Sequence, residues 1–401
     1  MKKICRVVCQ LSLLLALFLT TTVSAQSSFE QWLDEFKPVA GQQGVRQATW
    51  DKAFAGIFEF DAKVLEKANY QPEFTTEIWD YLDSRVNPIS ISRGLQMDRV
   101  HDETLSAVSD KFGVRRSVLL AIWSMESNYG EVLKRPERLH YVPQALATLA
   151  YADPKRRKFG RSQLVAALKI LQAGDVHVEQ FSGSWAGAMG HTQFIPTSYL
   201  AYGIDMDGNG KRDIWNSIPD ALATAANLLH KNGWRTGKSW GYEVIVPSGS
   251  GKLEGQTKLI SEWQKLGFQR PAGRAFPRPG EKAVLKLLAG DAGPGFLMMR
   301  NFFVLKRYNN ADAYALGVGL LADRLAGYPG MAQTWPRPPE SLNGEEKIEL
   351  QRLLKKQGYY DGEIDGNLGK GSRAAIAEFQ RKAGVNPDGA PSKSILLLLR
   401  K

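Results

Sequence analysis

The chain has 401 residues, of which 43% are hydrophobic and 23% are charged, enough for at least two domains with packed cores. This composition excludes a wholly disordered, collagen-like or coiled-coil protein. The formal net charge is +11, yet the Lys and Arg residues are scattered along the chain and form no stripe. The charge would suit a membrane surface or an anionic polymer and does not decide between them, and we expect no nucleic acid as a partner.

Residues 1–25 are predicted to be an export signal. Three cations near the start are followed by a nearly continuous apolar run over residues 11–19, and Val23-Ser24-Ala25 offers small residues for cleavage. The run is too short to span a bilayer comfortably, and no later stretch resembles a membrane helix. We expect a periplasmic protein with no integral membrane segment; an uncleaved, membrane-anchored N-terminus is the alternative.

The positions of the cysteine and histidine residues exclude several kinds of catalytic and metal site. Cys5 and Cys9 are the two cysteines of the chain, and both lie inside the predicted signal. The predicted mature protein therefore has no acceptor for a lipid anchor, no disulfide, no catalytic thiolate and no cysteine–zinc site. No two of the five histidines are three or four residues apart, so the sequence predicts no helical zinc pair.

Residues 26–332 are predicted to form one large domain that is mainly α, an α+β fold with minor β structure. Apolar residues at helical spacing indicate helices near residues 29–33 and 51–54. Residues 118–125 are almost all apolar, which is typical of a helix buried in the middle of a domain. A further helix is expected over residues 221–230, and a strand over residues 242–246.

Residues 333–341 are predicted to be a linker, because three prolines in four residues favour an extended spacer. The remaining residues, 342–401, show two helical patterns, one with Leu350 and Leu354 and one with Ile376 and Phe379, separated by Gly-Asp turns. A unit this short lies near the lower limit for independent folding, which suits a compact three-helix module.

The first candidate for chemistry is Glu126, at the end of the apolar run over residues 118–125. Beside Trp123 and Met125 its carboxyl group would be partly desolvated, which raises a carboxyl pKa and lets it hold a proton near neutrality. Protonating a glycosidic oxygen requires such a group. The alternative is a salt-bridged glutamate on the exposed face of a helix.

The second candidate is the segment over residues 183–199. Its glycines, Gly183, Gly187 and Gly190, would let the backbone approach a ligand closely, and its amide and aromatic side chains suit the edges and faces of sugars. A plain tight turn is the alternative.

A third pattern predicts a cation site. Residues 205–211 place oxygen ligands at positions 1, 3 and 5 and a glycine at position 6, as an EF-hand loop does, but Asn216 stands where the closing glutamate belongs. The candidate ligands are Asp205, Asp207, Asn209, the carbonyl group of Lys211, and Asp220, with Asp213 less favoured. Any Ca²⁺ here would be structural, and an Asx-turn without metal is the alternative.

Three motifs carry a resemblance to a known family: Glu126-Ser127-Asn128-Tyr129-Gly130, the segment over residues 184–199, and Arg307-Tyr308-Asn309. Together they resemble the membrane-bound lytic murein transglycosylase B family, which is glycoside hydrolase family 103 and has a lysozyme-like core. The resemblance implies cleavage of peptidoglycan glycan strands between N-acetylmuramic acid and N-acetylglucosamine, with 1,6-anhydromuramyl ends. It implies no cofactor for the chemistry.

The resemblance also assigns roles to individual residues. Glu126 matches the single catalytic acid and base. The positions that match sugar-contacting or cleft residues are Ser184, Gln193, Tyr308, Asn309, Tyr314 and, more weakly, Tyr81. The family is similar in closing the cation loop with a late aspartate, here Asp220.

Two other functions stay open. A hydrolytic muramidase would need a positioned water and usually a second carboxylate. A non-catalytic wall-binding scaffold would keep the fold without the reaction. Residues 342–401 resemble the peptidoglycan-binding domain of the first type, although such a helical module can also dock other proteins, and any partner among cell-wall synthesis proteins is unknown.

Overall fold

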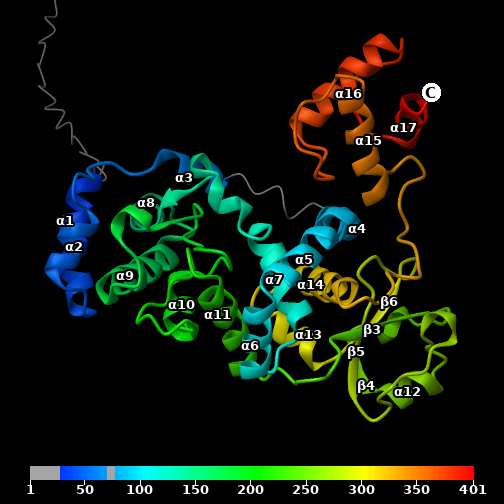
Figure 1. The fold of residues 1–401 in the computed structure, drawn as a ribbon, viewed down its shortest axis with the longest axis horizontal. Helices are drawn as coiled ribbons and strands as arrows, with labels where there is room; N and C mark the ends of the chain where they lie inside the picture. The colour runs from blue at the N-terminus through cyan, green and yellow to red at the C-terminus, as the bar shows by residue number, and fades with distance from the viewer. Residues whose placement is uncertain (1–27, 70–76) are drawn as a thin grey trace, which may run out of the picture.

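The computed structural model describes residues 28–69 and 77–401, so the predicted signal lies outside the described residues. Most of the chain is helical, as predicted (Figure 1). The helices that precede the main sheet are α1 (Phe29–Gln42), α2 (Gln47–Ala53), α3 (Ala62–Asn69), α4 (Ile78–Arg85), α5 (Pro88–Val100), α6 (Asp102–Phe112), α7 (Arg116–Ser127), α8 (Val142–Ala152), α9 (Arg157–Ala173), α10 (Pro196–Tyr202) and α11 (Ile218–Lys231). Two short strands, β1 (His140–Tyr141) and β2 (Ser182–Gly183), pair antiparallel among them.

Helix α7 lies at the centre of the helical core, as its apolar sequence predicts. Residues 117–125 are all buried, whichever side of the helix they occupy. The helix α14 (Asp312–Leu325) packs along α7, and Gly317 permits this because a Cβ atom there would lie 3.0 Å from Met125 Cε. The same glycine also faces Tyr81 and Leu82 of α4, so three helices meet at one point.

The region over residues 241–298 forms a small sheet with a core of its own. Its elements are β3 (Gly241–Val244), β4 (Thr257–Leu259), α12 (Ile260–Lys265), β5 (Lys282–Lys286) and β6 (Gly295–Met298). The strand order is β3-β6-β5-β4, with each neighbouring pair antiparallel. The sequence predicted a single strand over residues 242–246, whereas pairing of β3 with β6 ends at Val244 and three further strands complete the sheet.

The chain then returns to the helical core through α13 (Arg300–Leu305) and α14, and continues into a C-terminal module. The module contains α15 (Gly344–Lys356), α16 (Lys370–Lys382) and α17 (Lys393–Leu399) around a separate core with Leu350, Leu354 and Ile376. Asn343 caps α15 in a capping box with Glu346. Figure 1 shows this module, in orange and red, beside α4.

The segment that joins α14 to the module is extended and packed. The ring of Trp335 stacks on Phe296 of β6, with ring centroids 6.1 Å apart. The guanidinium of Arg337 binds both carboxylate oxygens of Asp83 on α4, each at 2.7 Å. Within residues 28–69 and 77–401, no helix combines the length and apolar character needed to cross a membrane.

Candidate active site

Glu126 lies in the last turn of α7 and is half-buried. Burial raises the pKa of its carboxyl group from 4.5 to about 7, although a hydrogen bond from Tyr314 and the charge of Arg85 act in the opposite direction. Among the described residues, none of the groups that shift this pKa is a second carboxylate. Near neutral pH the group therefore exists in comparable amounts as acid and as carboxylate.

Three tyrosines surround this carboxyl group. The Tyr314 hydroxyl donates a hydrogen bond to Glu126 Oε1 at 2.5 Å, and the ring of Tyr308 stacks on that of Tyr314 with centroids 6.2 Å apart. Burial raises the pKa of Tyr308 and Tyr314 well above 10, and that of Tyr81 to about 12; the charge of Glu126 contributes in each case. All three phenols remain neutral and can donate hydrogen bonds near pH 7.

The turn that follows Glu126 is strained. Asn128 and Tyr129 have φ values of 51° and 60°, in the left-handed region that non-glycine residues rarely adopt. Gly130 follows at φ 88°, and a Cβ atom there would lie 2.4 Å from the ring of His191. Such strain persists only where surrounding contacts impose it. Here the Ser127 hydroxyl donates to the carbonyl oxygen of His191 at 2.6 Å and accepts from the N–H of Gly130 at 2.9 Å.

The histidine beside this turn is not an acid or base candidate. The indole N–H of Trp123 donates to His191 Nδ1 at 3.1 Å, and burial lowers the pKa of His191 to about 4. The ring is therefore neutral at physiological pH and serves to join α7 to the glycine-rich segment. Of Glu126, His191 and the three tyrosines, Glu126 is the group whose charge changes near pH 7.

The glycines of residues 183–190 approach the protein's own atoms closely. A Cβ atom would lie 2.5 Å from the carbonyl oxygen of Ala188 at Gly183, and 2.4 Å from that of Ile214 at Gly190. The sequence had suggested that these glycines admit a ligand. The structure gives them a packing role, since each lets the folded segment press against neighbouring backbone.

The predicted sugar-contacting side chains of this segment shape its turns. Ser184 Oγ accepts from the N–H of Ala188 at 3.0 Å, and Gln193, at φ 49°, donates from Nε2 to the carbonyl oxygen of Gly190 at 2.8 Å. Both side chains are half-buried. The segment meets the tyrosine pair through Phe194, whose ring packs edge-on against Tyr308 with centroids 5.2 Å apart.

The structure thus brings some predicted residues together and leaves others apart. Glu126, Tyr314, Tyr308 and Tyr81 converge on one point. Asn309 is exposed, and its Oδ1 accepts from the N–H of Ala311 at 3.1 Å at the start of α14. Its side chain is engaged in a local turn near the tyrosine pair.

The predicted cation ligands also converge. Carboxylate oxygens of Asp205, Asp207 and Asp220 lie within 4.8 Å of one another. Asp220 is fully buried, and both of its oxygens accept N–H groups of the loop, including Met206 at 2.7 Å and Asp213 at 2.8 Å. Burial and the charge of Asp207 raise the pKa of Asp220. No cation of the described residues pairs with these three carboxylates, so the donor set fits a hard divalent ion such as Ca²⁺.

Asp213 serves a different purpose in the same loop. Its Oδ1 accepts from the N–H groups of Trp215 and Asn216, each at 2.9 Å, in an Asx-turn. This leaves Asp220 as the late aspartate that faces Asp205 and Asp207.

Sequence reasoning missed several residues that hold the site. Arg85 acts on the pKa of Glu126 and lies four residues after Tyr81 on α4, so helical spacing could have found it. Ser127 and His191 stand within the recognised motifs, but nothing in the sequence reveals the hydrogen bond that joins them.

Comparison with known proteins places this arrangement among characterised folds. The family described as "Transglycosylase SLT domain" matches residues 28–323, and a peptidoglycan binding domain family matches residues 343–399. The crystal structure of SltB3 from Pseudomonas aeruginosa in complex with NAG-anhNAM-pentapeptide is 43% identical, with a TM-score of 0.74, and the alignment covers 94% of this chain and 100% of that one.

More distant relatives cover less of the chain. SltB1 from Pseudomonas aeruginosa, a soluble lytic transglycosylase, is 25% identical with a TM-score of 0.64, over 75% of this chain and 98% of that one. The membrane-bound lytic murein transglycosylase B of Escherichia coli (strain K12) is 26% identical over 250 residues, which are 61% of this chain and 66% of the relative.

Proposed function

The chain belongs to the lytic transglycosylases with a transglycosylase SLT domain, and from this membership we propose that it cleaves peptidoglycan between N-acetylmuramic acid and N-acetylglucosamine, leaving 1,6-anhydromuramyl ends. The observation that carries the proposal is the state of Glu126, a half-buried carboxyl group with a pKa of about 7 and a hydrogen bond from Tyr314. A single carboxylate suffices where the substrate supplies its own nucleophile, whereas a hydrolase usually needs a second carboxylate.

In the proposed reaction, Glu126 first acts as an acid. It gives its proton to the glycosidic oxygen as the bond from the anomeric carbon of the muramyl unit to that oxygen breaks. The carboxylate so formed then takes the proton of the muramyl 6-hydroxyl group, whose oxygen attacks the anomeric carbon and closes the 1,6-anhydro ring. No water is consumed, and Glu126 ends protonated, ready for another cycle.

The surrounding tyrosines support both halves of this cycle. The hydrogen bond from Tyr314 stabilises Glu126 in its carboxylate form, the form that takes the second proton in the proposed cycle. Tyr308 is held by its own hydrogen bond to the carbonyl oxygen of Thr192 at 2.6 Å, and it fixes Tyr314 by stacking. Ser184, Gln193, Asn309 and Tyr81 are proposed to contact the sugars of the bound strand.

The test is a digestion of purified peptidoglycan by the wild type and by Glu126→Gln, with mass analysis of the muropeptides. We expect wild-type products that lack one water relative to hydrolysed ones, and a loss of at least about a thousandfold in rate with the variant, because the amide can neither give nor take the proton. A matched control is Glu131→Gln, which removes a carboxylate near the same turn that pairs with Lys134.

Other outcomes would favour the other functions. Reducing muramyl ends would make the protein a hydrolytic muramidase that uses a positioned water. No products from the wild type, with sedimentation on cell-wall sacculi retained, would make it a wall-binding scaffold.

We further propose that residues 205–220 hold a structural Ca²⁺ through Asp205, Asp207, Asn209, the carbonyl group of Lys211, and Asp220. The ion would brace the loop by neutralising three carboxylates, and the reaction itself would need no cofactor. We expect Ca²⁺ added to EDTA-treated protein to raise the melting temperature, with a gain of about 2.7 kcal/mol at a hundredfold excess over Kd. Asp220→Asn should abolish that gain, whereas an unchanged wild-type melting curve would contradict the site.

The remaining assignments follow from the same function. Residues 342–401 would bind peptidoglycan and raise the local concentration of substrate. Residues 1–25 would direct export to the periplasm, where the wall is accessible.

A further inference from the structure

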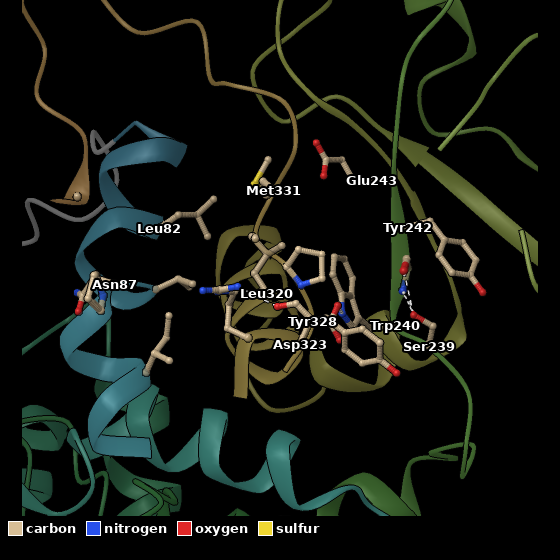
Figure 2. A pocket seen from close by; sticks show the side chains of 18 of the residues that line it. Leu82, Asn87, Ser239, Trp240, Tyr242, Glu243, Leu320, Asp323, Tyr328 and Met331 are labelled. Atoms are coloured by element: carbon tan, nitrogen blue, oxygen red, sulfur yellow. Dashed lines mark hydrogen bonds between the residues drawn. The ribbon is translucent and has the colours of Figure 1, made fainter. Parts of the chain in front are cut away.

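A cavity of about 1070 Å³ lies between α5, the end of α14, β3 and the extended segment before the module (Figure 2). Glu126 is not among the residues that line it. Figure 2 shows Leu82 of α4, Leu320 of α14 and Trp240 beside β3 around one space, with Met331 at its edge. Pockets for small organic ligands commonly have volumes of about 300–1,000 Å³, so this cavity is large enough for such a ligand.

Contacts between elements hold the walls of this cavity in place. The indole N–H of Trp240 donates to Asp323 Oδ2 at 3.0 Å, and Gly319 admits the ring, because a Cβ atom there would lie 2.6 Å from it. Glu243 accepts a hydrogen bond from the N–H group of Ala332 at 2.9 Å, which fastens the extended segment to β3. The space is therefore bounded by groups that the fold fixes.

Part of the lining is apolar and comes from α5, α14 and the segments beside them. Several half-buried side chains pack on the helical core and also line the cavity: Val86, Ile91, Leu320, Met331 and Trp335. Leu95 of α5 lines it too, and its side chain is 39% exposed. A ligand with an apolar body would remove this surface from water, which is favourable.

Another part of the lining is basic. Seven arginines and Lys238 line the cavity, against four acidic residues. Three of the arginines come from one loop after α12, at a spacing of four residues: Arg270, Arg274 and Arg278. Three prolines within residues 270–279 restrict the backbone of this loop, so its cations are presented on a stiff support.

The acids of the lining do not neutralise this loop. Asp83 pairs with Arg337, and Asp323 lies 3.9 Å from Arg115. Of the other two acids, one accepts backbone N–H groups and one is exposed on α15. Within the described chain, no ion pair joins an acid to the first or second arginine of the loop. The cavity is thus charged to receive an anion.

The loop arginines are already held in position. The guanidinium groups of Arg270, Arg274 and Arg278 each donate to a backbone carbonyl oxygen, at 2.7, 3.3 and 2.9 Å respectively. Burial and the charge of Arg274 lower the pKa of Arg270, as expected where two cations lie close together.

One donor of this loop is buried and unused. Among the described residues, Arg278 Nη1 has no hydrogen-bond partner. Its nearest acid is Glu281 at 3.6 Å, and that carboxylate also binds Lys238 at 2.5 Å. Buried polar groups are normally hydrogen-bonded, so an anion at this place would satisfy a donor that the protein itself leaves open.

We propose that this cavity binds a phosphate monoester with an apolar chain, the phosphate pairing with Arg270, Arg274 and Arg278 and the chain covering Leu95 and Leu320. A phosphate monoester carries nearly two negative charges at neutral pH, which suits several cations, and guanidinium groups bind phosphate through paired, charge-assisted hydrogen bonds. The site rests on the cavity alone and does not involve Glu126, so it is independent of the proposed reaction.

The test is calorimetric titration of the full chain with decyl phosphate, below the concentration at which it forms micelles. Two further probes separate the parts of the ligand: inorganic phosphate has the charge without the chain, and decyl maltoside has the chain without the charge. We expect decyl phosphate to bind at least about tenfold more tightly than either of them, because only this probe uses both parts of the lining.

Charge variants locate the phosphate. Arg274→Gln/Arg278→Gln should bind decyl phosphate at least about tenfold more weakly. Arg352→Gln/Arg381→Gln removes the same charge at exposed positions of the module, outside the cavity lining, and should bind as the wild type does. If the first double variant melts at a lower temperature, Arg274→Gln alone, at an exposed position, replaces it and should weaken binding at least about threefold.

Apolar variants locate the chain. Leu95→Gln should weaken the binding of decyl phosphate about threefold and leave that of inorganic phosphate unchanged. Leu397→Gln, at a leucine of α17 that is 55% exposed and outside the lining, is the matched control and should change neither.

Several results would overturn the proposal. Absence of decyl phosphate binding to the wild type would exclude the site. Equal affinity for inorganic phosphate would show a plain anion site without the chain, and equal affinity for decyl maltoside would show that the arginines play no part. Unchanged binding by the arginine variants, with unchanged melting curves, would place the phosphate elsewhere.

Discussion

At the scale of single residues, the behaviour of Glu126 comes from opposing effects on one proton. Burial disfavours the carboxylate and raises the pKa, whereas the hydrogen bond from Tyr314 and the charge of Arg85 favour the carboxylate. The resulting pKa of about 7 means that the acid form predominates below pH 7 and is lost as the pH rises through 7. A general acid matched in this way to its working pH gives and takes a proton with little cost in either direction.

Tyr314→Phe tests this balance. Removing a hydrogen bond that the carboxylate accepts should raise the pKa of Glu126 above 7, so the alkaline limb of the kcat/KM profile should move to higher pH. The maximal rate should fall by about tenfold, because a bond to a charged group contributes roughly 1.5–3 kcal/mol. Tyr359→Phe, in the module, serves as the control and should leave the profile unchanged. A limb that stays in place or moves to lower pH would contradict the assigned role.

The sequence predicted the burial of Glu126 but not the residues that contact it. The desolvation of Glu126 follows from the apolar residues immediately before it, and the structure agrees. Its partner Tyr314 lies 188 residues further along the chain, a pairing that no local pattern encodes. Tyr314 was predicted only from the resemblance to a known family. Neither the local sequence patterns nor that resemblance indicated that Ser184 and Asn309 form local turns.

At the scale of elements, two glycines of α14 decide how closely other parts approach this helix. Gly317 meets the flexible end of Met125 at 3.0 Å, whereas Gly319 meets the rigid ring of Trp240 at 2.6 Å, both measured from an added Cβ atom. A methyl group is therefore easier to accommodate at the first position than at the second.

Gly319→Ala should lower the free energy of unfolding by about 1–3 kcal/mol, because Trp240 must move and its hydrogen bond to Asp323 is disturbed. Gly317→Ala, in the same helix, is the matched variant and should change stability by less than about 1 kcal/mol, since the gain in helix propensity offsets a small shift of Met125. Denaturant titration followed by circular dichroism compares the two. Equal losses of unfolding free energy in the two variants would contradict the prediction that the contact of Gly319 with Trp240 is the less tolerant one.

Long apolar patterns predicted elements well, and short ones did not. The helices predicted over residues 118–125 and 221–230 are both present, as α7 and α11, close to the expected bounds. Strand β6 was missed because it is buried throughout and so shows no alternation of polar and apolar residues. Strand β4 has three residues, too few for any period to appear.

At the scale of the whole molecule, the described chain packs around three separate principal cores, one helical, one under the small sheet and one in the module. The sequence predicted the large helical region and the module but not the sheet as a unit of its own. Helix α4 connects two of these parts, since Tyr81 faces Glu126 while Asp80 and Asp83 bind Lys347 of α15 at 2.6 Å and 3.0 Å.

The double variant Arg337→Ala/Lys347→Ala should release the module from α4. It removes both cations that pair with the largely buried Asp83, and an unpaired charge of this kind costs about 3 kcal/mol. We expect a larger radius of gyration in small-angle X-ray scattering. Arg400→Ala breaks an exposed pair with Glu349 inside the module and should leave the radius as it is. An unchanged radius in the double variant would show that other contacts suffice.

The proline-rich segment, predicted to be an extended spacer, is extended and is also fastened to the rest of the chain. Trp335 is stacked on the sheet, Arg337 is bound to α4, and Glu243 holds the backbone at Ala332 and Gln333. A freely moving tether governs only how often cleavage occurs. In the proposed function, a module held in one place would also fix the distance between the point where it binds the wall and the bond that is cleaved, and with it the position along a strand at which each cleavage falls.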